Sequence, residues 1–205
     1  MLQTFKRVMV LAPHTDDGEF GCGATIARLV ERGSDVHYVA FSDCAESLPE
    51  GWPPDTLVKE LYAATEVLGL PPENVQVHQL PVRNFTVHRQ AILEMLVKIQ
   101  RGLDPDLVLM PSVNDLHQDH QTVAVEGRRA FKFTTILSYE IPWNNVIFQN
   151  QLFVHLDEGH VSKKVQALAC YESQAHRPYA TEETIRAQAR MRGTQINTRY
   201  AEVFE

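Results

Sequence analysis

The stretch RVMVLAPHTDDGEFGCGATIARL, residues 7–29, decides how this chain folds and where its chemistry lies. Its first six residues are largely apolar and predict a short buried strand, and the apolar spacing further on predicts a helix over 24–32. Between the two stand His14 and the adjacent acids Asp16 and Asp17. Neighbouring carboxylates repel each other, and a bound cation would relieve that repulsion and give the imidazole a partner. The stretch therefore predicts a strand that ends at a metal site.

The rest of the chain continues the alternation of strand and helix. Strands are predicted over 7–12, 35–42, 74–80, 107–110, 134–140 and 152–156. Helices are predicted over 24–32, 56–68, 87–101, 121–131, 162–170 and 181–192. This order predicts an α/β fold: a Rossmann-like, doubly wound, mostly parallel sheet with helices on both faces. With 205 residues, no internal repeat and no dividing linker, we expect a single domain over residues 1–205.

A second group of metal-binding side chains, His117, Asp119 and His120, follows the predicted fourth strand. In a doubly wound sheet the first and fourth strands are neighbours, and ligands bind outside their carboxyl ends. The predicted topology thus brings both groups to one crevice. Imidazole and carboxylate together suit zinc, which at catalytic sites takes three protein ligands. The remaining side chains would be free for proton transfer, whereas the competing interpretation makes the acids helix caps.

Composition narrows the classes of function. The net charge of -7 argues against nucleic acid or an anionic membrane as the main partner. Three cysteines without a C-x-x-C pair favour a reducing compartment, so we expect a cytoplasmic protein. No apolar run reaches the length of a membrane span, and the start lacks a signal peptide. The glycine-rich GEFGCG lacks dinucleotide-loop spacing, and Gly21 and Gly23 are expected to allow close packing.

Two motifs resemble those of a known family. PHTDDGEFGCGATIARL, residues 13–29, is similar to the A-H-P-D-D-E-x-x-x-G-G signature of the PIG-L/LmbE-like zinc-dependent deacetylases, the N-acetylglucosaminyl de-N-acetylases. PSVNDLHQDH, residues 111–120, resembles their P-S-x-x-D-x-H-x-D-H motif, and the C-terminal KVQALACYESQ and TRYAEVFE resemble family segments with S-Q and A-E-x-F. The resemblance implies hydrolysis of the N-acetyl group of an N-acetylglucosamine-type sugar, free or linked to a lipid, nucleotide or other aglycone.

The resemblance also implies roles for single residues. His14, Asp17 and His120 match the zinc ligands, and Asp16 matches the general base that activates the attacking water. Zn²⁺ is the implied cofactor, although sites of nitrogen and oxygen ligands also accept Fe²⁺ or Mn²⁺. Because family members are often oligomers, the resemblance leaves a homo-oligomer open.

The remaining two matched residues complete the implied mechanism. His117 matches the group that stabilises the oxyanion or protonates the leaving amine, and Asp119 matches the acid that orients and tunes His117. This chain departs from the family pattern at Thr15, where proline is usual, and at Glu19, which is displaced by one position. These departures leave the predicted metal chemistry intact.

The substrate is less well specified than the metal chemistry. LVKE, residues 57–60, stands where the family often has Arg-Glu-Glu, so a substrate-binding arginine is missing or relocated. Candidate substrate contacts near the predicted strand ends are Asp43, Arg83, Asn84, Glu140, Trp143, Arg177 and Tyr179. The other histidines, His37, His78, His88, His155, His160 and His176, are predicted to be structural or exposed. Two alternatives stay open: a metal-dependent amidase acting on a non-sugar N-acyl substrate, and a non-catalytic sugar-binding module with a structural metal.

Overall fold

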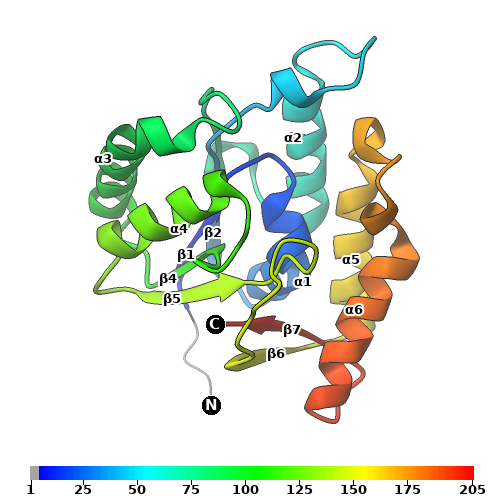
Figure 1. Ribbon diagram of the computed structural model, residues 1–205. Coiled ribbons are helices and arrows are strands. Elements are labelled where there is room, and N and C mark those ends of the chain that lie inside the picture. Colours follow the sequence, from blue (N-terminus) through cyan, green and yellow to red (C-terminus); the bar gives the residue numbers. More distant parts are fainter. Residues whose placement is uncertain (1–4) are drawn as a thin grey trace.

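The computed structural model describes residues 5–205 and contains one seven-stranded sheet between two layers of helices (Figure 1). The strands are β1 (Arg7–Ala12), β2 (Asp35–Ala40), β3 (Val75–Val77), β4 (Leu107–Pro111), β5 (Thr135–Tyr139), β6 (Leu152–Leu156) and β7 (Tyr200–Phe204). The helices are α1 (Asp17–Glu31), α2 (Thr56–Leu68), α3 (Phe85–Leu103), α4 (Gln118–Ala130), α5 (Glu158–Ala169) and α6 (Glu182–Gln195). The architecture confirms the predicted Rossmann-like, mostly parallel α/β fold.

The strand order is β3-β2-β1-β4-β5-β7-β6. β1 pairs in parallel with β2 on one side and with β4 on the other, and β4 pairs in parallel with β5. Only β7 runs antiparallel to its neighbours, β5 and β6, within the described part of the chain. β1 and β4 are therefore adjacent, as predicted, and the loops that leave their carboxyl ends start side by side.

The core lies on both faces of β1, which explains why this strand is apolar throughout. Val8 and Val10 pack in the cluster that includes residues of α1 and α2, on the face covered by α1, α2 and α5. Met9 and Leu11 point the other way, into the cluster formed with α3 and α4. Successive side chains of a strand alternate between faces, so a central strand of a parallel sheet is buried on both.

The structure corrects two sequence predictions about these elements. The helix predicted over 24–32 begins earlier, at Asp17, and is broken at Cys22, whose φ of -146° and ψ of 22° are not helical. Apolar periodicity missed its first turn because Gly18 and Gly21 pack there on tyrosine rings rather than on aliphatic side chains. β7 was not predicted, because the buried Glu202 interrupts its apolar pattern.

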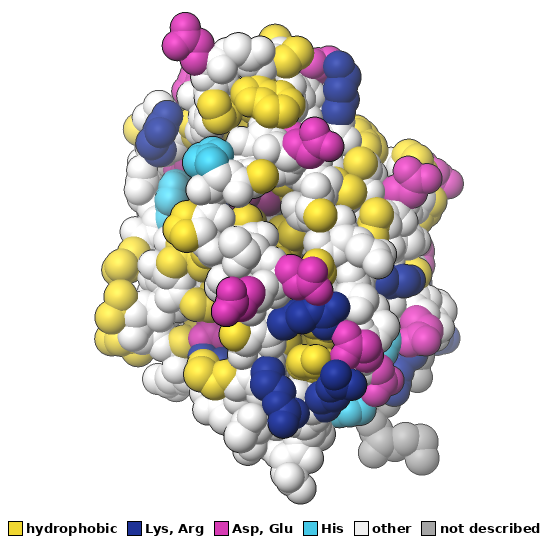
Figure 2. Space-filling view, turned by 90° about the vertical axis from the view of Figure 1, so that its right-hand side faces the viewer, with side chains coloured by type: hydrophobic (Ala, Val, Ile, Leu, Met, Phe, Trp, Pro, Cys, Tyr) yellow, Lys and Arg dark blue, Asp and Glu magenta, His cyan; other side chains and the backbone are white. Residues whose placement is uncertain are grey.

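The outer face of α5 and α6 carries both acidic and basic side chains. Figure 2 shows acidic and basic side chains lying side by side on it, and Arg186 pairs with both Glu158 and Glu182. Exposed pairs of this kind contribute little to stability but leave no continuous basic surface on this face. Between residues 5 and 205, no helix is both long and apolar enough to cross a bilayer.

Candidate metal centre and active-site cleft

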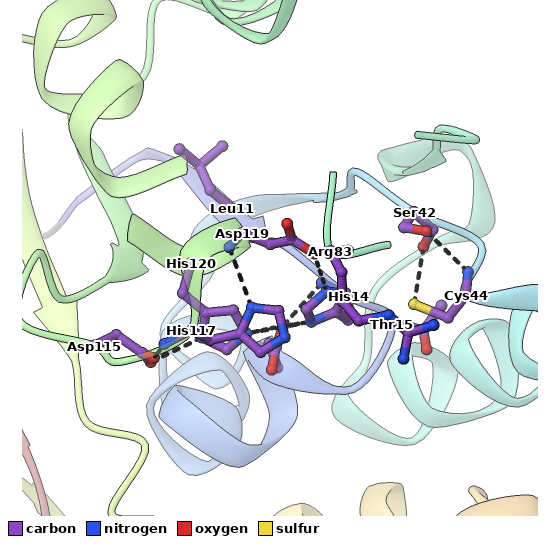
Figure 3. A network of polar contacts seen from close by, with 12 residues as sticks. Leu11, His14, Thr15, Ser42, Cys44, Arg83, Asp115, His117, Asp119 and His120 are labelled. Carbon is purple, nitrogen blue, oxygen red and sulfur yellow. Dashed lines mark hydrogen bonds and ion pairs between the residues drawn. The ribbon is translucent and has the colours of Figure 1, made fainter. Parts of the chain in front are cut away.

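Two segments of chain meet at the carboxyl ends of β1 and β4. We call residues 13–21, which follow β1 and enter α1, the first segment, and residues 112–120, which follow β4 and enter α4, the second segment. The imidazole rings of His14, His117 and His120 lie close together between them (Figure 3). The topology thus brings together side chains that are a hundred residues apart in sequence.

Three donor atoms form a nearly equilateral triangle. His14 Nδ1 lies 3.0 Å from Asp17 Oδ2, His120 Nε2 lies 3.1 Å from the same oxygen, and the two nitrogens are 3.2 Å apart. A divalent ion with bonds of about 2.1 Å places neighbouring ligand atoms about 3.0 Å apart in octahedral and about 3.4 Å apart in tetrahedral coordination. The triangle fits such an ion without selecting zinc over other metals.

Two buried carboxylates determine which nitrogen of each ring faces the triangle. His14 Nε2 lies 3.0 Å from Asp119 Oδ2, and His120 Nδ1 lies 2.8 Å from Asp115 Oδ2. Because a carboxylate accepts a hydrogen bond, each ring carries its hydrogen on that side and directs its lone pair to the triangle. Carboxylate–imidazole pairs of this type orient ligands and raise their basicity at metal sites.

The electrostatics of the triangle favour positive charge. Burial opposes ionisation of His14 and His120, but the charge of Asp17 and hydrogen bonds to nearby carboxylates outweigh it, raising their pKa values to about 9 and about 10. Burial likewise opposes ionisation of Asp17, but the two imidazoles hold the pKa of its carboxyl well below the usual range. The same negative potential that retains protons here would attract a metal ion.

His117 faces the same space but is bound differently. Its Nδ1 accepts a hydrogen bond of 3.1 Å from the backbone N–H of Asp119, so His117 is the N-cap residue of α4. A backbone N–H only donates, and therefore Nε2 of the neutral ring carries the hydrogen. Burial and the neighbouring imidazoles lower the pKa of His117, which favours the neutral ring.

This tautomer bears on which residues could hold a metal. Ring nitrogens of His14, His117 and His120 lie within 4.8 Å of one another and could together hold an ion. With its hydrogen on Nε2, however, the His117 ring presents a donor to the site rather than a lone pair. The triangle completed by Asp17 suits a cation better, and it contains the three residues predicted as ligands.

Asp16 is buried at the floor of the cleft, and its carboxylate has no hydrogen bond to the helix that it precedes. This absence argues against the interpretation of Asp16 as a helix cap. Burial raises its pKa, the charge of Asp17 adds to that effect, and Arg177 opposes it. A buried carboxylate with a raised pKa that is not used as a helix cap is suited to accept a proton.

Asp119 has hydrogen-bond partners that the sequence prediction did not include. Its carboxylate does not contact the ring of His117, because it accepts hydrogen bonds from His14 and from the backbone N–H groups of Arg83 and Phe85, at 2.6 and 3.2 Å. It is fully buried and outside the cleft lining. Asp119 therefore orients His14 and ties the loop before α3 to the centre, and its charge also acts on His117, where it opposes the lowering of the pKa.

Two buried tyrosine hydroxyls contact the backbone between His14 and Asp16. The carbonyl of Thr15 lies 2.7 Å from the hydroxyl of Tyr171 and 3.1 Å from that of Tyr38, and both hydroxyls also contact Glu19. Burial raises the pKa of Glu19 to about 8. These contacts restrain the backbone at Thr15.

A cleft of about 290 Å³ opens over the centre. Four of the predicted substrate-contact residues line it: Arg83, Trp143, Arg177 and Tyr179. The rings of Trp143 and Tyr179 are stacked, with centroids 4.0 Å apart, and Phe20 packs edge-on against both. These rings form an aromatic wall, and the guanidinium of Arg177 lies 2.5 Å from the hydroxyl of Tyr179.

Three other predicted contacts do not line the cleft. Asp43 accepts a hydrogen bond from the backbone of Ala45 within its own turn. Asn84 is the exposed N-cap residue of α3. Glu140 is buried behind the cleft, where it pairs with Arg192. Position after a strand does not determine which way a side chain points, and substrate contact by these three residues stays a prediction that the cleft does not support.

The structure adds residues that sequence reasoning did not assign. Asp115 orients His120 and was present, without a role, in the second motif. Gln174, from the S-Q segment, lines the cleft, and the adjacent Ser173 is anchored through two hydrogen bonds to the buried Glu60 of α2. In both cases the motif resemblance was the signal. The remaining lining residues are Thr15, Cys44, Ser47, Leu57, Val82 and Asn144.

The chain matches a known protein family and a curated relative. Residues 9–131, more than half of the chain, match the family model PIG-L, described as GlcNAc-PI de-N-acetylase. The chain is 28% identical over 182 residues to the uncharacterized deacetylase YaiS of Escherichia coli, a match that spans 82% of this chain and 91% of that protein.

Solved structures share the fold at lower identity. The N,N'-diacetylchitobiose deacetylase of Pyrococcus horikoshii aligns with a TM-score of 0.82 and 20% identity over 98% of this chain and 83% of its own. The 4-carboxy-2-hydroxymuconate hydratase GalB of Pseudomonas putida aligns with a TM-score of 0.79 and 20% identity over 98% and 95%. Proteins named for different reactions therefore share this architecture, and the site must decide between them.

Proposed function

This chain belongs to the PIG-L family of de-N-acetylases and is a metal-dependent hydrolase of that class; we propose that it removes the acetyl group of an N-acetylated amino sugar. The observation that carries the proposal is the triangle of His14, Asp17 and His120 beneath a cleft that Asp16 and His117 also face. A site built only to hold a structural metal would need neither of those last two side chains.

The residues of the triangle would hold the metal, with zinc as the ion to test first. The outer ring nitrogens of the two histidines are bonded to Asp119 and Asp115, so that their inner nitrogens face the carboxylate of Asp17, whose negative charge favours a cation. A divalent ion in such a site polarises a carbonyl group and makes water more acidic.

Asp16 would serve in proton transfer, and His117 would stabilise the oxyanion. The side chain of Asp16 does not cap α1 and would take the proton from the attacking water. His117 keeps its Nε2 hydrogen toward the cleft and would donate it to the developing oxyanion of the acetyl group. The geometry supports both roles.

The cleft suits a sugar ring. The stacked Trp143 and Tyr179 offer a flat apolar surface, and Arg177, Arg83 and Gln174 offer donors around it. Its volume of about 290 Å³ is at the lower limit for small-molecule sites, which are about 300–1,000 Å³. We infer that one N-acetylhexosamine ring occupies the cleft, and that any aglycone extends beyond it.

The decisive experiment measures acetate release by metal-stripped protein, with and without added Zn²⁺. The panel contains N-acetylhexosamines that are free, nucleotide-linked and lipid-linked, together with N-acyl amino acids. Zinc-restored release from a sugar supports the proposal and identifies the carrier. Release only from N-acyl amino acids would favour a non-sugar amidase, and stoichiometric metal binding without any release would favour a binding module.

A further inference from the structure

The break in α1 lies next to the centre and has a definite cause. In an unbroken helix the backbone N–H of Ala24 would bond to the carbonyl of Phe20, four residues earlier. Here the N–H of Ala24 donates instead to Glu202 Oε1, at 3.2 Å, and the N–H of Thr25 donates to Oε2, at 2.7 Å. The carbonyl of Phe20 accepts from Lys164 Nζ, at 2.6 Å.

Lys164 and Glu202 thus stand between two halves of one helix. They are 2.8 Å apart, and their side chains are 6% and 7% exposed. The ammonium satisfies the last carbonyl of the first turn, and the carboxylate satisfies the first N–H groups of the continuation. Insertion of side chains into the i→i-4 ladder is a recognised cause of helix breaks. Gly23 leaves room for the lysine stem, since a Cβ there would lie 3.2 Å from Lys164 Cγ.

The turn that this break redirects carries the chemistry. It begins with Asp17, which completes the metal triangle, and ends near Phe20, whose ring supports both Trp143 and Tyr179. In a straight helix, the axis of α1 would determine where the side chains of Asp17 and Phe20 point. Because α1 is broken at Cys22, the first turn can take a different direction, and its contacts with the ion pair determine that direction.

We propose that Lys164 and Glu202 are positioning residues, which hold Asp17 in the metal triangle and Phe20 against the aromatic wall by keeping α1 broken. This inference rests on the proposed metal ligands, but not on the identity of the substrate. It also gives a role to the A-E-x-F segment, whose acid is Glu202 and which lies outside the residues matched by the family model.

The test replaces both charges together, as Lys164→Met with Glu202→Leu. Either single change would bury an uncompensated charge, whereas replacing a buried pair by apolar side chains is often neutral for stability. In the double variant the carbonyl of Phe20 and the N–H of Ala24 can bond to each other and straighten the helix. We expect thermal stability near that of the unaltered protein, together with Zn²⁺ affinity at least tenfold weaker, measured by competition with a chromogenic chelator.

A neighbouring buried ion pair supplies the control. Arg192 and Glu140 are 13% and 7% exposed and join α6 to the end of β5. Among the described residues this pair makes no hydrogen bond to α1. The matched double change, Arg192→Met with Glu140→Leu, is expected to leave Zn²⁺ affinity within twofold.

Fluorescence provides a second readout that does not depend on metal or activity. In a Trp52→Phe background Trp143 is the only tryptophan, and its emission should shift when Phe20 moves. A folded Lys164→Met/Glu202→Leu variant with unchanged Zn²⁺ affinity and emission would overturn the proposal. If that variant does not fold, Lys164→Met with Glu202→Met replaces it, because it also removes both charges and both hydrogen-bonding groups, and unchanged affinity there has the same meaning. Failure to release acetate from any substrate would leave these comparisons intact.

Discussion

The two segments that carry the candidate centre are held in place in different ways. The second segment is largely self-contained: Asp115 bonds both to the ring of His120 and to the backbone N–H of His117, and His117 caps the helix that follows. The first segment depends on distant parts of the chain, since Tyr38, Tyr171 and the Lys164–Glu202 pair hold its carbonyls and its break.

The two segments differ in whether the contacts that order them come from nearby residues or from distant parts of the fold. The contacts of Asp115 with His117 and His120, and the cap that His117 forms, arise within nine residues, so a short motif supplies much of the order in that half of the centre. The half that contains Asp16 and Asp17 requires β2, α5 and β7 to be folded. Substitutions should therefore affect the two segments differently, and the predictions below are ordered by the size of the expected effect.

The largest effect is expected for His120→Ala, which removes a ligand from the self-contained half. A carbon chain cannot replace the lone pair of Nε2, and the carboxylates of Asp17 and Asp115 lose their shared partner. We expect metal content after dialysis, measured by elemental analysis, to fall below about a tenth of an equivalent, with activity lost in parallel. Retention of stoichiometric metal would remove His120 from the ligand set.

Asp16→Asn tests the first segment without touching the triangle. Since the carboxylate of Asp16 has no hydrogen bond to the helix, the fold and the metal should be retained. Loss of a general base typically lowers kcat by about 10²–10⁴. Steady-state kinetics at saturating metal would measure the change, and metal content should match that of the unaltered protein. Equal loss of metal in this variant and in His120→Ala would contradict the division between base and ligand.

His117→Asn separates capping from catalysis in the second segment. Asparagine is a good N-cap residue and can accept from the N–H of Asp119, but its shorter side chain cannot place a donor where Nε2 lies. We expect kcat to fall about 10²–10³-fold, as for loss of one oxyanion donor, with thermal stability nearly unchanged. His117→Ala is the companion variant, because it should show the same loss of kcat and lower stability as well.

Tyr171→Phe is expected to have the smallest effect on the metal centre. It removes a hydrogen bond to the first segment only. It removes a buried donor from the carbonyl of Thr15, which should cost about 1–3 kcal/mol of unfolding free energy. Zn²⁺ affinity should fall less than about fivefold, because Tyr38 still contacts that carbonyl. Tyr139→Phe removes a similar buried hydrogen bond, to Leu11, and should lower stability without changing affinity. Equal affinities in both variants would show that the carbonyl of Thr15 needs no second restraint.

Sequence reasoning succeeded where information is local or topological. The strand over 7–12 and the helix over 56–68 have the predicted bounds, because apolar runs and Gly69 mark them. The adjacency of β1 and β4 followed from the order of elements, and it brought His14 and His120 together. The single-domain organisation over 1–205 and the individual catalytic roles stay predictions.

Sequence reasoning failed where a side chain acts across the fold. Glu202 bonds to α1 from 178 positions away, and no local period reveals that it breaks a helix. Asp119 was assigned to its sequence neighbour His117, whereas the structure pairs it with His14, 105 positions away. Glu140 was expected at the cleft because it follows a strand, but Arg192 holds it elsewhere. Such pairings depend on the packed arrangement of elements.

The position of β7 has a consequence for how the protein is made. Residues 9–131 contain every proposed ligand, the base and the oxyanion donor, and this part leaves the ribosome before β7. Glu202 belongs to β7, the antiparallel strand between β5 and β6, and is synthesised about seventy residues after position 131. The nascent chain therefore displays its metal-binding side chains before it can hold them in register. On this view a product that stops before β7 would bind metal poorly.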